Sequence, residues 1–216
     1  MKIQFIDTNL LTRGRLEVAI TRAESPLLFW VQLRSGWNHL MELEEALNLR
    51  MPQQSAHLLI RPENMKKNME VAVKDFRIWR RGFIKEINKT TLMVEVVLGD
   101  WGHTTWCRMS DVYLLEDRFK HLAWQGIMCG LDHIGPPTNI TTWPEGTRAI
   151  CRMFLSQHDG WINIIHPLRK GAALVEIHIY TDKPENISFN FKDTLVRMGH
   201  VQLTSETTVD VYPTAQ

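Results

Sequence analysis

Residues 92–108, LMVEVVLGDWGHTTWCR, contain two β-strands and the tight turn that joins them. Residues 92–98 are apolar for most of their length and alternate as a half-buried strand does. Asp100 to His103 form the turn, because the glycine at its centre tolerates positive φ. The chain then returns as a strand over residues 104–108. This hairpin predicts a mainly β fold.

More short strands precede this hairpin. Residues 69–73 and 79–87 have strand character, and a turn at 88–90 separates the second of them from residue 92. Several strands joined by tight turns within residues 69–114 predict a small closed barrel, because closure removes exposed strand edges. A short helix is expected near Asp117.

The flanking segments predict a second body with some α-structure. Residues 16–21 and 27–33 form a hairpin, and a helix begins after Gly36 and ends before Pro52. Residues 51–68 then form a connector. Beyond the barrel we expect strands at 125–134, 147–155, 161–166 and 172–180, and a helix at 188–198 capped by Asn190 and Gly199.

The composition of the 216 residues is that of an ordinary globular protein, with 44% hydrophobic and 23% charged residues. A net charge of +1 argues against a bulk phosphate binder, which carries a basic excess. No apolar run is long enough to span a membrane. The three cysteines have no CxxC spacing and indicate reduced thiols in a cytoplasmic protein.

Motifs for catalysis or metal binding are missing from the sequence. There is no GxSxG, HExxH, P-loop or CxxC pattern, and the nine histidines are scattered. His121 and His133 flank Cys129, but not at a spacing that a helix or turn would bring together. Cys107 is expected to be a core thiol, and Glu44 and Glu45 a solvated helix face. We therefore predict no enzyme, no metal and no cofactor.

Trp101 stands out among the eight tryptophans because it lies in a turn between polar residues. A tryptophan displayed on a barrel loop is a platform for a cation or a flat guanidinium group. The other interpretation is a lid over the end of the barrel. Trp30, Trp37 and Trp124 lie in apolar contexts and are expected in the core.

Five segments in order resemble the extended Tudor domain. They are SPLLFWVQL at 25–33, WRRG at 79–82, GDWGH at 99–103, residues 119–131, and FKDTLVRMGH at 191–200. Each motif alone is weak, whereas their order and spacing across residues 14–203 are fairly specific. The resemblance implies an SH3-like Tudor barrel inserted in a staphylococcal-nuclease-like OB fold. Its implied segments are 14–60 and 118–205 for the nuclease-like part and 61–117 for the barrel.

The resemblance also implies a function. Members of the family act in germline piRNA silencing, in the cytoplasm and at perinuclear germ granules, and bind arginine-rich tails of Piwi-clade Argonaute proteins. Symmetrically dimethylated arginine is held in a cage of four aromatic rings and an asparagine. No metal-binding acidic cluster accompanies the nuclease-like segments, so no nuclease activity is expected.

This sequence departs from that cage. Lys74, Arg80 and Leu98 stand where the family has rings, and His103 stands where it has asparagine. Trp101 is the remaining ring, unless Phe76 shifts in to provide a second. Each ring contributes ~0.5–2 kcal/mol to holding a cation, so this site is expected to gain little from methylation.

The sequence therefore predicts an adaptor that binds an arginine-rich Piwi-clade tail without requiring methylation. Asp100 would pair with the arginine, Trp101 would stack on it, and Leu98 would offer an apolar wall. Two alternatives stay open. One is single-stranded RNA binding through the OB-like part, and the other is a self-association module.

Overall fold

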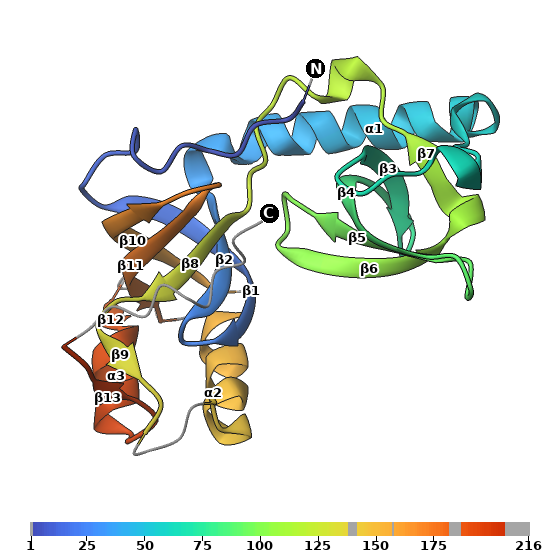
Figure 1. Cartoon of the computed structure of the whole chain (residues 1–216). Coiled ribbons are helices and arrows are strands. Elements are labelled where there is room, and N and C mark those ends of the chain that lie inside the picture. Colours follow the sequence, from blue (N-terminus) through green and yellow to red (C-terminus); the bar gives the residue numbers. More distant parts are fainter. Residues whose placement is uncertain (1, 138–141, 157, 182–186, 206–216) are drawn as a thin grey trace. The chain divides into compact units, whose positions relative to one another are not determined.

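The computed structural model describes residues 2–137, 142–156, 158–181 and 187–205. These residues form two compact units (Figure 1). One contains residues 36–125 and the N-terminal residues up to Phe5, and the other begins with residues 6–35 and continues from Gly126. The helix after Gly36 thus belongs to the same unit as the barrel. The predicted boundaries instead place this helix in the nuclease-like segment 14–60 and the barrel in the segment 61–117.

The first unit is built on a five-stranded antiparallel sheet in the order β6-β5-β4-β3-β7. Its apolar side chains, among them Val73, Val96 and Leu98, form one enclosed core. The predicted barrel over residues 69–114 is therefore confirmed. The strands are β3 (Glu70–Asp75), β4 (Ile78–Asn88), β5 (Met93–Leu98), β6 (His103–Arg108) and β7 (Val112–Leu114).

Helix α1 (Trp37–Leu58) packs on the outer face of this sheet through Leu47 and Met51, which contact a cluster that includes Trp79. The prediction that the helix ends before Pro52 is wrong. Proline removes one backbone donor, but the apolar face continues through Met51 and its packing outweighs that loss. Residues 51–58 are therefore helix rather than connector.

The second unit contains a sheet in the order β10-β1-β2-β8-β11-β12, in which β10 also pairs with β11, so that the sheet closes on itself. The N-terminal hairpin, β1 (Leu16–Ser25) and β2 (Leu28–Leu33), pairs with β10 (Asp159–Leu168) and β8 (Ile127–Leu131). The hairpin therefore belongs with the C-terminal half of the chain, which confirms that the Tudor barrel is an insertion. The remaining strands are β9 (Ile134–Gly135), β11 (Ala172–Tyr180), β12 (Ser188–Asn190) and β13 (Gln202–Leu203).

Two helices complete this unit. Residues 147–155, predicted as a strand, lie in helix α2 (Glu145–Leu155), so that prediction is wrong. Thr147, Cys151 and Leu155 are its buried residues, and their four-residue spacing is the helical signal that was missed. Helix α3 (Phe191–Arg197) has the predicted cap, because the side chain of Asn190 accepts a hydrogen bond from the Asp193 N–H. Residues 188–190, predicted as part of this helix, instead form strand β12.

Short 3₁₀ turns occupy several connections. The turn near Asp117 is the predicted short helix. Among the residues that the structure describes, no helix is long and apolar enough to cross a membrane. The turns are η1 (Arg34–Gly36), η2 (Pro62–Asn64), η3 (Met109–Asp111) and η4 (Asp117–Phe119).

Candidate functional site

Three of the predicted site residues, Arg80, Trp101 and His103, come together at one end of the Tudor barrel. Trp101 lies in the turn between β5 and β6. The N–H groups of Trp101 and Gly102 both donate to the carbonyl of Leu98, at 3.0 and 2.9 Å. Gly102 has a φ of 74°, which a side chain would strain, so this glycine permits the turn that presents the indole.

The guanidinium of Arg80 covers the face of this indole. Its central carbon lies 4.0 Å from the centroid of the Trp101 ring. Its Nη1 donates to Oε1 of Glu44 at 3.2 Å. Its Nε lies 3.3 Å from Oδ2 of Asp75, an ion pair whose angle does not make a hydrogen bond. Only 13% of the Arg80 side chain is exposed, so the guanidinium is largely withdrawn from water.

Glu44 connects this arrangement to helix α1. Its Oε1 also accepts a hydrogen bond from the indole N–H of Trp101 at 2.7 Å. Burial raises the pKa of Glu44, and the neighbouring Arg80 charge opposes that rise. The expectation that Glu44 lies on a solvated helix face is therefore wrong. The ring of Trp37, also on α1, meets Trp101 edge to face at 6.4 Å.

Asp75 provides the second carboxylate. It is buried, and its Oδ2 lies 3.2 Å from Nε2 of His103. The β3–β4 register pairs Val73 with Arg80, so Asp75 and Arg80 lie on the same face of the sheet. We call Glu44, Asp75, Arg80, Trp101 and His103 the guanidinium cluster.

Asp100 differs from the expectation. It is 1% exposed and forms a bidentate ion pair with the adjacent strand's Arg81, at 2.7 and 2.9 Å. It also accepts the backbone N–H of Gln125 at 2.9 Å. The predicted pairing of Asp100 with a peptide arginine is therefore wrong, because an internal arginine already holds this carboxylate.

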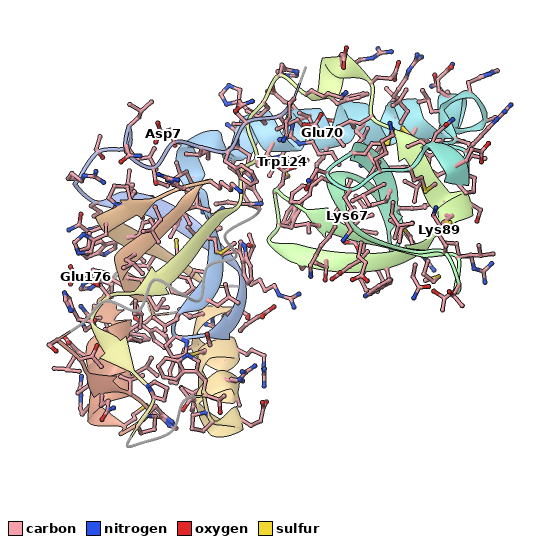
Figure 2. All side chains as sticks on the ribbon, viewed as in Figure 1. Asp7, Lys67, Glu70, Lys89, Trp124 and Glu176 are labelled. Atoms are coloured by element: carbon pink, nitrogen blue, oxygen red, sulfur yellow. The ribbon has the colours of Figure 1, made fainter. Side chains whose placement is uncertain are left out.

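Arg81 is fully satisfied within the same unit. Besides the two bonds to Asp100, it donates to the backbone carbonyls of Phe119, Leu122 and Ala123, at 2.7 to 2.9 Å. Its guanidinium lies 4.9 Å from the ring of Trp124, which is labelled in Figure 2. This network ties residues 119–125 to the barrel and is structural.

The side chains of the other three predicted residues are not part of the cluster. Leu98 is fully buried in the barrel core, so the prediction that it offers a wall to a ligand is wrong. Lys74 lies on the opposite face of β3 from Asp75, with its ammonium 5.9 Å from the ring of Trp79. Phe76 is 96% exposed at the β3–β4 turn and makes no described ring contact with Trp101.

The described cysteines offer no activated nucleophile. Burial raises the pKa of Cys107 to about 11 and that of Cys151 to about 12, and it raises the pKa of Cys129 as well. These thiols stay protonated near neutral pH, and a nucleophile needs the thiolate.

The guanidinium cluster holds a planar cation, the Arg80 guanidinium, between an indole and two carboxylates.

Comparisons with known proteins agree with this architecture. A sequence model of the Tudor domain matches residues 14–133. A search of curated protein sequences returned no significant match. Among solved structures, the fold is similar to extended Tudor domain TD3 from mouse TDRD1 in complex with a MILI peptide containing dimethylarginine. That structure has a TM-score of 0.79 and 17% identity, over 94% of this chain and 99% of the other.

Two further structures share the fold. One is an aspartate-to-alanine variant of the Drosophila melanogaster Papi extended Tudor domain in complex with an unmethylated Piwi N-terminal peptide, with a TM-score of 0.75 and 18% identity over 88% and 99% of the two chains. The other is the human TDRD1 extended Tudor domain with a symmetrically dimethylated peptide, with a TM-score of 0.76 and 16% identity over 94% and 95%. Because the sequence match spans more than half of the chain, this protein belongs to the Tudor domain family, and its fold is that of an extended Tudor domain.

Proposed function

We propose that this protein is a non-catalytic adaptor that binds arginine-rich N-terminal tails of Piwi-clade Argonaute proteins without requiring arginine methylation. Its place of action would be the germline cytoplasm, in piRNA-guided silencing. Family membership supports peptide binding, since extended Tudor domains of this fold have been solved with MILI and Piwi N-terminal peptides. The Piwi peptide, solved with an aspartate-to-alanine variant of Papi, is unmethylated.

One observation supports independence from methylation. Arg80 places its own unmodified guanidinium 4.0 Å from the Trp101 ring and beside the carboxylates of Glu44 and Asp75. Carboxylates recognise the N–H donors of a guanidinium, and methyl groups replace some of those donors. A peptide arginine that exchanges with Arg80 therefore keeps more hydrogen bonds if it is unmethylated.

Calorimetry tests this proposal. An arginine-rich Piwi-clade N-terminal peptide would be titrated in unmodified and symmetrically dimethylated forms. We expect the unmodified form to bind as well as the dimethylated form or better, and Trp101→Ala to weaken binding by ~1–2 kcal/mol through loss of the stacking surface. A tenfold preference for dimethylarginine, ~1.4 kcal/mol, would contradict the proposal.

A groove on the Tudor barrel, rather than on the OB-like part where RNA binding was expected, favours single-stranded RNA as a second candidate ligand. It is lined by the rings of Trp79, Trp106 and Tyr113 and by two cationic side chains, Lys74 and Arg108. Trp106 is 51% exposed. An exposed ring beside cations is typical of single-strand binders. Trp79 itself is buried, and Asp111 also lines the groove. Anisotropy of a labelled RNA should then fall with added salt and with Trp106→Ala, and an RNA that does not bind would remove this candidate.

A further inference from the structure

Three potential metal ligands converge in the second unit, whereas the guanidinium cluster belongs to the first. Asp132 directly follows β8, His133 is the next residue, and His166 lies in β10. One ligand atom from each of these residues lies within 4.8 Å of the other two. The fold therefore brings together side chains that their sequence spacing separates.

Irregular backbone places both histidines. His133 has a φ of 52°, in the left-handed region that few residues other than glycine adopt. In β10 the register with β11 shifts between Ile164 and His166. Residues 160, 162 and 164 are buried in alternation, and regular alternation would bury His166 as well. The bulge instead turns His166 outward, and bulges commonly re-aim side chains in this way.

Two of the distances between the ligand atoms are close to those around a shared cation. Oδ2 of Asp132 lies 3.5 Å from Nε2 of His133 and 3.5 Å from Nε2 of His166. A direct hydrogen bond would bring these atoms to about 2.7–3.2 Å. Two ligands of a tetrahedral zinc ion, each about 2.0–2.1 Å from the metal, are separated by roughly 3.3 Å. The two observed separations of 3.5 Å are closer to the separation of two zinc ligands than to a hydrogen bond.

We propose that Asp132, His133 and His166 bind a divalent transition metal ion of the zinc type. Two imidazoles and a carboxylate suit Zn²⁺ and Co²⁺ better than Mg²⁺ or Ca²⁺, which prefer oxygen ligands. The Asp132 side chain is 9% exposed, whereas those of His133 and His166 are 46% and 54% exposed. The carboxylate is thus the buried ligand and the two imidazoles are the exposed ligands. Water would complete the coordination.

A lysine of helix α3 fixes the position of Asp132, the buried ligand of this site. Nζ of Lys192, in α3, donates to the backbone carbonyl of Asp132 at 2.6 Å and fixes that residue. A bound ion would link the β8–β9 turn to β10 and stabilise this unit by mass action.

Calorimetry with ZnCl₂ and absorption spectroscopy with CoCl₂ test the proposal on the full chain without an affinity tag. The variants are His166→Ala, Asp132→Asn and His133→Asn, the last because asparagine tolerates positive φ. His39→Ala removes an exposed histidine on α1 and serves as the control. Circular dichroism verifies that each variant is folded.

We expect the wild-type protein and His39→Ala to bind one Zn²⁺ and to show the visible bands of tetrahedral Co²⁺. Each site variant should bind at least ~10-fold more weakly, as losses at metal sites usually are. Zn²⁺ should raise the melting temperature of the wild-type protein but not of His166→Ala. Absence of saturable binding, equal binding by the site variants, or a cobalt–thiolate band that points to a cysteine would each overturn the proposal.

Discussion

Arg80 and Arg81 are neighbours on β4, and strand alternation directs their side chains to opposite faces. Arg81 is 1% exposed, and its donors all reach acceptors, so it is a structural element of the first unit. Arg80 is held at the end of the barrel by an indole face and two carboxylates. Sequence motifs identify both arginines but do not distinguish their roles.

Asp100→Ala should destabilise the fold rather than act on a ligand. The substitution leaves the buried Arg81 guanidinium without its bidentate partner, and breaking a buried pair costs ~3–5 kcal/mol. Urea unfolding measures this loss. Asp117→Ala is the matched control, because the Asp117 carboxylate is exposed where it pairs with Lys120 and its loss should cost far less than that of Asp100. Similar losses for the two variants would contradict the assignment.

Glu116 should give part of the stability its pH dependence. Hydrogen bonds from Arg50 and Arg118 lower the pKa of Glu116 from 4.5 to about 2. Because the folded-state pKa is lowered, this contribution is present above pH 4.5 and is lost as the pH falls through about 2. Solvent screening limits it to ~1 kcal/mol. Glu116→Gln should be less stable than the wild-type protein at pH 7, with the difference shrinking toward pH 3. A pH-independent difference would argue against this origin.

At the scale of elements, the connection between α1 and β4 determines how the guanidinium cluster is assembled. Asn48 of α1 accepts the backbone N–H of Trp79 at 2.7 Å and donates to its carbonyl at 2.9 Å. The side chain thus acts as a substitute strand partner for the first residues of β4, which precede its pairing with β5 at Phe83. It fixes the helix that brings Glu44 to Arg80.

Asn48→Ala should cost ~1–3 kcal/mol, because it deprives two backbone groups of Trp79 of a partner. Thermal unfolding measures the loss, and Asn38→Ala, an exposed position on the same helix, is the control. Circular dichroism and tryptophan fluorescence should report that the cluster around Trp101 loosens as well. Equal stability of the two variants would contradict the role given to Asn48.

The strands could be predicted from sequence because their alternation and turn residues are local. The continuation of α1 past Pro52 could not, since it depends on packing of Met51 against distant residues. Helix α2 was missed because Thr147, Ile150 and Cys151 also suit a strand, although the four-residue burial spacing favours a helix.

At the scale of the whole molecule, the topology explains which parts of the site the sequence could reveal. The insertion of the barrel between β2 and β8 was predictable from the resemblance, and strand pairing confirms it. Trp101, Arg80 and His103 were found because motifs mark them. Glu44 and Asp75 were missed as partners because their contacts with Arg80 join separate elements, which no local pattern records.

The central claim is that the protein's own Arg80 occupies the surface that would hold a peptide arginine. Calorimetry of Arg80→Ala with the unmodified arginine-rich peptide tests it most directly. Arg77→Ala, an exposed position in the preceding turn, makes the same charge change and is the control. Because the peptide no longer has to displace Arg80, we predict that Arg80→Ala binds roughly tenfold more tightly than the wild-type protein, ~1.4 kcal/mol. Arg77→Ala should show little change. Folded Arg80→Ala that binds no more tightly than Arg77→Ala would contradict the account.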